Sequence, residues 1–556
     1  MAGNILTPLN VWGNFNIPNP PSAQVLSEYT NEDFNVTELH IDGRETFYGR
    51  VRIHAIEVSR VGILNAPSLL IISSLDEGPD FNHAFYFAEE GYRVLMIDLR
   101  GKTEEKFYTE YPDNISYANY SECKNSLLKV EDDVTSTCWY EWANAARYAA
   151  EYLKSSSGDK KLGALGIGKG AGILWQTLAF NDNFACAAFV GDTGWREYHG
   201  IFKFSNLESP QFSDESLKFI SGSDPQSYSK HVKCPCFVVS ATNSPENDCD
   251  RAYDTLSRID ASAYRALDYS VGYIEGVKWS EFDDLKIFFK EYMTVGGKKG
   301  LPNEMDISAA VENGKVNVTV VPDEKNLVSV TVYAAENIVN PAHRTWVPVT
   351  ALNAEGGKYI AEYLPYYKSG AAFFFAKAVY GNGFTISSYI ISKKFTEKDI
   401  PVNHKDTIIF SGRNKGSETV FSPVRADGGS YVEGKDREVK IAEGPMGIEG
   451  VTAAGGLTSY KVNAEKYRPG EYAILMFDVC SQEATDFKVT LKTKNENGTE
   501  YSAKTSISGG NVWYNVKFEM SKFKTAEGMV LKTYEELFSI SFSCEKKFLV
   551  NNVIWV

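Results

Sequence analysis

The glycine-rich residues from Gly163 to Gly172 have the spacing of a catalytic turn but lack its catalytic side chain. The apolar residues Leu162 to Ile167 lead through small residues into a second apolar segment, Ile173 to Ala179, which predicts a strand, a sharp turn and a helix. A nucleophilic serine at such a turn lies in the pattern Gly-x-Ser-x-Gly. The chain has Gly166-Ile-Gly168-Lys-Gly170 or, one step later, Gly168-Lys-Gly170-Ala-Gly172, so both registers place glycine where the serine would stand. Glycine has no side chain and cannot attack a carbonyl carbon.

Two nucleotide-binding motifs overlap the same residues. The segment from Gly163 to Lys169 fits the phosphate-loop spacing, but Gly170 stands where that loop has the serine or threonine that binds Mg²⁺. The segment from Gly166 to Ala171 fits the dinucleotide-binding fingerprint, with Asp192 about twenty residues later. Both motifs are short in a glycine-rich chain and are therefore weak indications. The simpler interpretation is that the glycines let the strand and the helix pack closely.

The elements around this turn alternate between strands and helices. Apolar runs predict strands at 68–73, 92–97, 185–190, 236–240 and 264–269, and helical periodicity predicts helices at 81–90, 142–153, 250–259 and 279–293. Such alternation predicts a parallel sheet wrapped by helices, a doubly wound α/β fold. A hairpin is expected before it, with strands 36–41 and 47–54 on either side of a turn at Asp42 and Gly43.

The pattern changes after residue 300. Helical periodicity disappears, and short alternating strands with turn residues between them continue to the C-terminus. We therefore expect three domains, an α/β domain at 1–300, an immunoglobulin-like β-sandwich at 301–399 and a jelly-roll-like β-sandwich at 400–556.

The α/β part resembles the α/β-hydrolase superfamily, and within it the acetyl-xylan-esterase and dienelactone-hydrolase type. The resemblance rests on the segment from Phe87 to Gly101 and on the helix containing Trp142 and Arg147, which leads into the glycine-rich turn. It covers residues 61–295. The C-terminal strands resemble a carbohydrate-binding module in their pattern alone.

The resemblance implies a triad of serine, acid and histidine in that chain order. The nucleophile position falls on Gly168, with Gly170 as the other register. The acid position follows the strand 236–240 and falls on Asn243, with Glu246 or Asp248 as possible replacements.

The histidine position follows the strand 264–269 and falls on Gly272. No histidine occurs between His231 and His343. Activation of a hydroxyl requires a general base with a pKa near neutrality at hydrogen-bond distance, and the expected one is absent. The resemblance therefore implies a hydrolase fold without its catalytic residues.

Part of the binding apparatus is expected to remain. In this family backbone N–H groups after the nucleophile and in the turn after the third strand bind the oxyanion, which here implies Lys169, Leu75 and Asp76. Asp192 and His199 are weaker candidates, because an aspartate can orient an imidazole in a working site.

The composition limits the partners. A net charge of −15 argues against nucleic acids and anionic membranes, both of which require basic patches. No segment reaches the roughly 18 apolar residues of a membrane span, and no secretory signal is visible. We expect a cytoplasmic protein, or an extracellular one if a signal peptide has been removed.

The cysteines indicate neither a disulfide framework nor a metal site. Eight cysteines are scattered along the chain, and Cys234-Pro-Cys236 has no second pair and no nearby histidine. We expect no metal and no other cofactor.

Two functions remain open. The first is a non-catalytic protein with a hydrolase-like fold that binds a carbohydrate or an acylated small molecule. The alternative is an active carbohydrate esterase, or another ester hydrolase, whose catalytic groups lie at non-standard positions such as Ser73 or Ser74. The sequence does not decide whether the chain is an enzyme, and it does not predict the oligomeric state.

Overall fold

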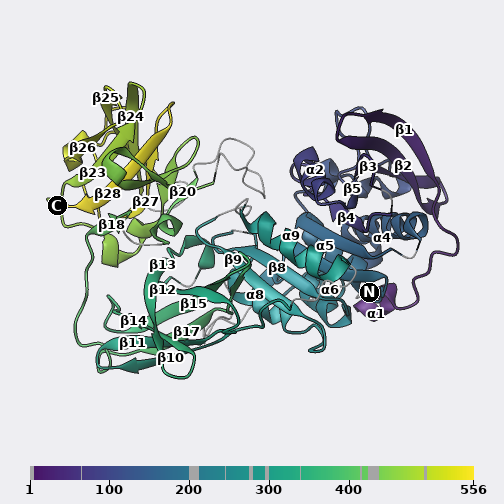
Figure 1. Cartoon of the computed structure of the whole chain (residues 1–556), viewed down its shortest axis with the longest axis horizontal. Helices are drawn as coiled ribbons and strands as arrows, with labels where there is room; N and C mark the ends of the chain where they lie inside the picture. The colour runs from purple at the N-terminus through teal and green to yellow at the C-terminus, as the bar shows by residue number, and fades with distance from the viewer. Residues whose placement is uncertain are drawn as a thin grey trace. The chain divides into compact units, whose positions relative to one another are not determined.

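The computed structural model describes residues 5–63, 65–158, 160–198, 212–244, 246–273, 280–294, 300–338, 340–412, 416–423, 438–493 and 498–556. The chain divides into two compact units (Figure 1). The first contains Met1–Ser240, Glu246–Asp268 and Glu281–Asn303, and the second contains Ala241–Pro245, Tyr269–Ser280 and Glu304–Val556.

A nine-stranded sheet forms the centre of the first unit. Its strand order is β1-β2-β3-β5-β4-β6-β7-β8-β9, and the pairs from β5 through β4, β6 and β7 to β8 are parallel. The strands are β1 (Ala23–Thr30), β2 (Phe34–Thr46), β3 (Gly49–Arg60), β4 (Ser68–Ile72), β5 (Arg93–Asp98), β6 (Leu162–Gly168), β7 (Phe184–Gly191), β8 (Cys236–Ala241) and β9 (Arg265–Ser270). A parallel sheet was predicted, and the structure has a mixed, mostly parallel α/β sheet.

Every residue of β4, β6 and β8 is buried, because helices cover the parallel part of the sheet. The helices are α1 (Pro8–Trp12), α2 (Phe81–Glu89), α3 (Tyr120–Cys123), α4 (Cys138–Ser157), α5 (Lys169–Leu178), α6 (Asp214–Gly222), α7 (Pro225–Tyr228), α8 (Cys249–Leu256) and α9 (Ser280–Met293). Helix α4 begins where the Thr137 hydroxyl accepts a hydrogen bond from the Tyr140 N–H at 3.4 Å.

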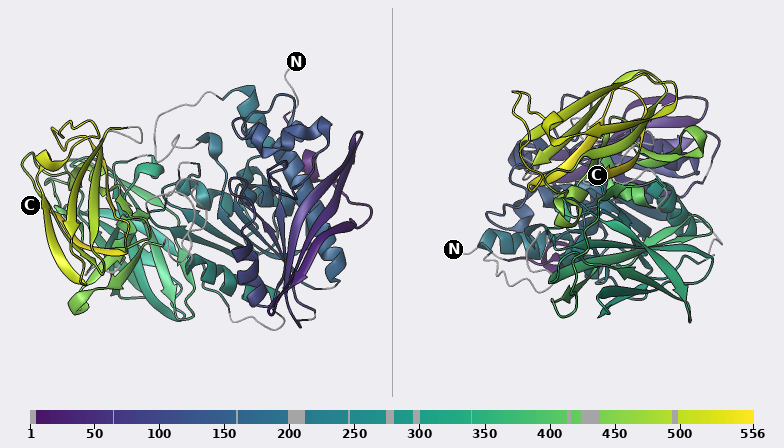
Figure 2. Two further views of the ribbon diagram at one scale, coloured as in Figure 1. Left: turned by 90° about the horizontal axis from the view of Figure 1, so that it is seen from above. Right: turned by 90° about the vertical axis from the view of Figure 1, so that its left-hand side faces the viewer.

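The N-terminal hairpin differs from the prediction. Strand β2 continues through Asp42 and Gly43, and the chain reverses at Phe47 and Tyr48 instead. A β-bulge shifts the register between Asp42 and Glu45, and a Cβ on Gly43 would lie 2.9 Å from the Val51 Cβ. The glycine therefore allows close approach of the neighbouring strand rather than a turn. Strand β1 pairs with β2 and makes the hairpin a three-stranded meander (Figure 2).

Antiparallel sheets make up the second unit, as expected for the all-β region. The first has the order β10-β11-β14-β13-β12-β15-β16, with β17 paired to β15. Its strands are β10 (Asp306–Glu312), β11 (Lys315–Val321), β12 (Leu327–Glu336), β13 (Val347–Ala354), β14 (Lys358–Tyr363), β15 (Gly370–Tyr380), β16 (Thr385–Ser387) and β17 (Ile391–Phe395).

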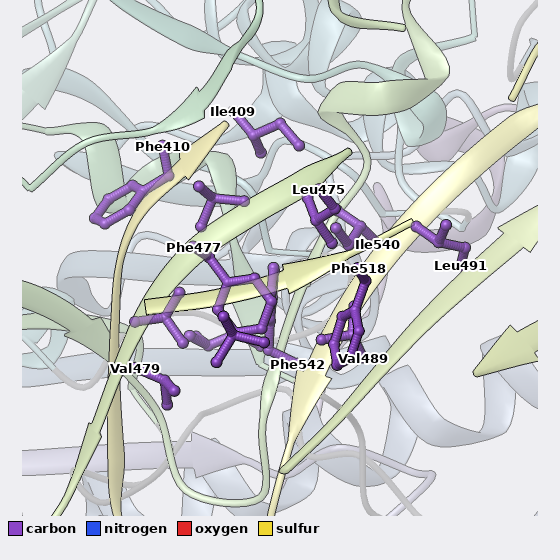
Figure 3. Close-up of a cluster of buried hydrophobic side chains, with 14 of the residues drawn as sticks. Ile409, Phe410, Leu475, Phe477, Val479, Val489, Leu491, Phe518, Ile540 and Phe542 are labelled. Atoms are coloured by element: carbon purple, nitrogen blue, oxygen red, sulfur yellow. The ribbon is translucent and has the colours of Figure 1, made fainter. Parts of the chain in front are cut away.

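Two further sheets follow, with the orders β20-β21-β28-β23-β26 and β19-β22-β27-β24-β25, and β18 pairs with β28. Their strands are β18 (Ile408–Phe410), β19 (Ser422–Pro423), β20 (Lys440–Glu443), β21 (Glu449–Thr452), β22 (Leu457–Ser459), β23 (Leu475–Ser481), β24 (Thr485–Thr493), β25 (Glu500–Ile507), β26 (Val512–Phe518), β27 (Leu537–Ser543) and β28 (Phe548–Trp555). Phe477, Val489 and Phe542 are fully buried in the core that the two sheets share (Figure 3).

Candidate functional site

The turn from β6 into α5 has the backbone geometry of a nucleophile elbow. Gly168 lies at the turn with φ 56° and ψ −128°, a strained conformation that side-chain-bearing residues rarely adopt. A Cβ on Gly166 would lie 2.6 Å from the Ala171 Cα, and one on Gly170 would lie 2.3 Å from the Ile72 carbonyl oxygen. The geometry therefore selects the first register, in which Gly168 holds the elbow position and its flanking glycines allow helix and strand to pack.

The glycines leave no room for a phosphate loop. Residues Leu162–Gly168 belong to β6 itself, so the chain has no loop between strand and helix that could surround a phosphate group. A Cβ on Gly172 would lie 2.2 Å from the Asp192 Oδ2, which is a further close approach of α5 to its surroundings. Close packing explains the glycine-rich sequence.

Lys169, the residue after the elbow, extends its side chain between two loops. Its Nζ lies 2.8 Å from the Asp76 Oδ2, in the turn after β4, and 3.0 Å from the Glu246 Oε2, in the loop after β8. The Lys169 side chain is 4% exposed, whereas those of Asp76 and Glu246 are 35% and 48% exposed. The ammonium is therefore buried, and its two carboxylate partners are partly hydrated.

Tyr120 completes this group, which we call the elbow cluster (Asp76, Tyr120, Lys169 and Glu246). The Tyr120 hydroxyl donates a hydrogen bond to the Asp76 carboxylate, and its ring centroid lies 6.0 Å from the Lys169 Nζ. Burial and the hydrogen bond to Asp76 raise the pKa of Tyr120 well above its usual value, so the hydroxyl stays protonated and remains a donor. The cluster lies at the carboxyl edge of the sheet, where α/β proteins bind ligands.

The turn after β4 is held by its own backbone. The Gly78 N–H donates to the Ser74 carbonyl at 2.8 Å, and the Asp76 N–H donates to the Ser74 hydroxyl at 3.3 Å. The Leu75 side chain is buried, and its backbone N–H has no acceptor in the described part of the chain. Of the residues predicted to bind, the structure brings Lys169 and Asp76 together, and Leu75 directly precedes Asp76 in the chain.

The predicted acid position, Asn243, serves packing within the second unit. Its Nδ2 donates to the Arg344 and Ala342 carbonyl oxygens, the latter at 3.3 Å, and its Oδ1 accepts from the Thr242 hydroxyl at 2.8 Å. Of the two replacements, Glu246 pairs with Lys169, and Asp248 accepts the N-terminal N–H of Asp250 in α8 at 3.1 Å.

The predicted histidine position, Gly272, is closed to side chains. Its φ is +81°, and a Cβ there would lie 2.4 Å from the Thr419 carbonyl oxygen. The Gly272 N–H donates to the Thr242 hydroxyl at 2.9 Å, and the Ser422 hydroxyl donates to the Gly272 carbonyl. A histidine at this position would require the backbone to move.

Of the second candidate pair, Asp192 and His199, the structure describes Asp192. Asp192 is buried, pairs with the Arg196 guanidinium and accepts the Gly194 N–H at 2.9 Å. His199 lies outside the described residues. Arg196 also lies over the Trp139 ring, 4.5 Å from its centroid, so the described partners of Asp192 are structural.

Tyr120 is a member of the elbow cluster that sequence reasoning missed. It lies in a polar stretch from 102 to 134, rich in Tyr, Asn, Glu and Lys, that contains no catalytic motif. Its contact with Asp76 joins residues 44 positions apart and depends on the tertiary fold. Among the described residues, no group of three or more His, Cys, Asp or Glu side chains could hold a metal ion, and no helix is long and apolar enough to cross a membrane.

Over about half of its length the chain is structurally similar to α/β-hydrolases. An acetyl xylan esterase from Thermoanaerobacterium sp. JW/SL YS485 shares 13% identity, with 51% of this chain and 90% of the esterase covered at a TM-score of 0.36. An acetyl xylan esterase from Paenibacillus sp. R4 shares 17% identity, with 49% of this chain and 90% of the esterase covered at a TM-score of 0.37. A dienelactone hydrolase-like phosphotriesterase from metagenomic libraries shares 12% identity, with 43% of this chain and 81% of the phosphotriesterase covered at a TM-score of 0.27. No protein-family model and no curated protein matches the sequence.

Proposed function

We propose that the first unit is a non-catalytic form of the hydrolase fold that binds a ligand at the carboxyl edge of its sheet and does not cleave it. The observation that carries this proposal is the elbow at Gly168, which has the geometry of a nucleophile position and no side chain. Acyl transfer through a covalent intermediate needs a nucleophilic atom at this point.

The base position supports the same conclusion. A Cβ at Gly272 would meet the Thr419 carbonyl oxygen, so no imidazole can be placed there without rearrangement. Asn243, at the acid position, is a neutral amide committed to backbone carbonyls. All three positions of the expected triad thus lack the group that the reaction uses.

The ligand that we propose is a carbohydrate or an acylated small molecule. The elbow cluster offers one ammonium, two partly exposed carboxylates and a phenol, which are hydrogen-bonding groups suited to hydroxyl and acyl oxygens. The N-terminus of α5 and the N–H of Leu75 add backbone donors for a carbonyl oxygen. In the second unit we assign the first sheet to an immunoglobulin-like fold and the last two sheets to a jelly-roll-like sandwich.

An active esterase with displaced groups is the other candidate, and the described contacts of its serines do not favour it. The Ser73 hydroxyl is buried and has no hydrogen-bond partner in the described ranges, so no base is in place to activate it. The Ser74 hydroxyl accepts the Asp76 N–H and holds the turn.

The test is initial-rate hydrolysis of p-nitrophenyl acetate by the intact chain and by a Gly168→Ser variant, each with and without a serine-reactive phosphonate. We expect neither protein to exceed the buffer rate, because the variant gains a hydroxyl but no base. A Gly168→Ala variant controls for the effect of a Cβ on folding. Phosphonate-sensitive turnover by the unmodified chain would overturn the proposal, and turnover gained by Gly168→Ser alone would overturn our account of the base position.

A further inference from the structure

Two lysines face each other across neighbouring strands of the second unit. Lys488 of β24 is directly opposite Lys504 of β25, and on its other side it is opposite Ser543 of β27. Phe487 and Ala503, which precede the two lysines, are buried, so the lysines and Ser543 lie on the outer face of this sheet. Like charges directly opposite each other destabilise an antiparallel pair. The fold alone does not account for this pairing.

Neither of the two ammonium groups is neutralised. Lys488 and Lys504 make no side-chain hydrogen bond and no ion pair with any residue that the structure describes. The same face of the same two strands contains the usual arrangement, because Lys492 is directly opposite Glu500 and its Nζ lies 3.4 Å from the Glu500 Oε1. The pairing of Lys488 with Lys504 departs from that arrangement, and two positive charges remain side by side.

Both lysines line a hollow with a volume of about 540 Å³. Ser543 lines it too, and its hydroxyl has no hydrogen-bond partner in the described part of the chain. Neighbouring strands lie about 4.8 Å apart, so the row of three side chains is about 10 Å wide. A third lysine of the hollow, Lys546, is already neutralised, because its Nζ lies 2.6 Å from the Glu483 Oε2. The hollow therefore offers two ammonium groups and one hydroxyl as donors.

We propose that this hollow, which we call the lysine pocket (Lys488, Lys504 and Ser543), binds the phosphate or sulfate group of a small molecule. A tetrahedral dianion between the two ammonium groups neutralises both of them and removes their mutual repulsion. One of its remaining oxygens accepts the Ser543 hydroxyl. A carboxylate carries a single charge and leaves one ammonium without a partner. This site lies in the second unit and is independent of the function proposed for the first.

Two acidic side chains limit the size of the ligand. Asp486 and Glu545 also line the hollow. Asp486 accepts a hydrogen bond from the Ser506 hydroxyl at 2.6 Å and so keeps its negative charge beside the lysines. A chain of phosphates that extended past the pocket would meet these carboxylates, and the net charge of −15 adds to the repulsion. The pocket is therefore suited to one dianionic group and not to a nucleic acid.

The first test is titration calorimetry of the intact chain with inorganic phosphate, sulfate, phenyl phosphate and acetate at constant ionic strength. We expect saturable binding of the dianions and weaker binding of acetate. Lys488→Met and Lys504→Met should each weaken phosphate binding by about tenfold or more, since each removes one of two charges. Lys517→Met is the matched control, because it removes an exposed lysine of β26 that is opposite Met476. The ratio of phenyl phosphate to inorganic phosphate affinity then distinguishes an esterified phosphate from the free ion as the ligand.

Thermal unfolding gives a second readout with a change of sign. Without phosphate, Lys504→Met should raise the unfolding midpoint of the β-sheet unit, because the repulsion is relieved. Phosphate at ten times its Kd should raise the midpoint of the unmodified chain by about 3 to 6 °C and leave that of Lys504→Met unchanged. Lys517→Met should respond to phosphate as the unmodified chain does.

Three results would overturn the proposal. The first is the absence of saturable binding by every dianion. The second is phosphate binding that Lys488→Met and Lys504→Met leave unchanged. The third is acetate binding as tight as that of phosphate, which would show that the pocket does not require a dianion. Phosphate binding that is lost in Lys169→Met and kept in both pocket variants is a case of the second result, and it would place the anion at the elbow cluster.

Discussion

The elbow cluster predicts an asymmetry between removing its lysine and removing its carboxylates. In Lys169→Met the buried ammonium is replaced by an apolar chain of similar length, and Asp76 and Glu246 remain 35% and 48% exposed and can be hydrated. We therefore expect a cost of about 1 kcal/mol or less, because the variant leaves no buried charge unpaired.

In the double variant Asp76→Asn with Glu246→Gln, the ammonium stays in a site where its side chain is only 4% exposed. Removing the charged partners of a buried ammonium costs about 3 to 5 kcal/mol. For a unit of this size each kcal/mol lowers the unfolding midpoint by about 2 to 4 °C, so the double variant should melt roughly 6 to 20 °C lower.

Scanning calorimetry of the full chain measures this effect, because the transition that contains the first unit should shift while the transition of the β-sheet unit does not. Double-mutant cycles between Lys169 and each carboxylate then separate the two ion pairs. If Lys169→Met were as destabilising as the double variant, the ammonium would not depend on these two carboxylates, and the geometry of the elbow cluster would be wrong.

Three further predictions concern two buried titratable groups and Gly272. Burial raises the pKa of Asp224 to about 7, so its protonated form contributes up to about 4 kcal/mol of stability below about pH 4, and this stability is lost as the pH rises through 7. Asp224→Asn should flatten the pH dependence of stability in urea titrations at pH 5 and 8, and an unchanged pH profile would contradict this prediction. Burial lowers the pKa of Lys461 to about 8, so the folded chain should gain about 3 kcal/mol of stability as the pH rises from 8 to 10.5. Lys461→Met should abolish that gain in the same urea titrations, and a gain that persists in the variant would show that Lys461 is not its source. Gly272→Ala should lower the melting temperature, because its Cβ would meet the Thr419 carbonyl at a φ of +81°, whereas Gly383→Ala, also at positive φ but with no atom within 4 Å, should cost less; equal effects would show that the contact with Thr419 is not restrictive.

The alternation of strands and helices was predictable because each buried strand is a short apolar run and each helix has an apolar stripe. The segments that became β4, β5, β6, β7 and β8 were assigned from their sequence alone, within a residue or two at each end. The turn at Asp42 and Gly43 was predicted wrongly, because a glycine in a bulge and a glycine in a hairpin turn have the same local sequence signal.

The candidate site was predictable only in part. Local sequence placed Gly168 at the elbow, because the elbow is built from consecutive residues. It did not indicate that Lys169 would pair with Glu246, which lies 77 positions away, or that Thr419 would close the position of Gly272. Contacts of this kind depend on how loops from distant parts of the chain meet, and no periodicity encodes them.

We propose above that the elbow holds no nucleophile. The most direct measurement is the intact mass of the full chain after prolonged incubation with a fluorophosphonate, which forms a covalent adduct with an activated serine. We expect an unmodified mass for the natural chain, since Gly168 offers no atom to react and Ser73 has no base among its described neighbours. A stoichiometric adduct, mapped by peptide mass spectrometry to Ser73 or to any other serine, would contradict it and establish a working nucleophile.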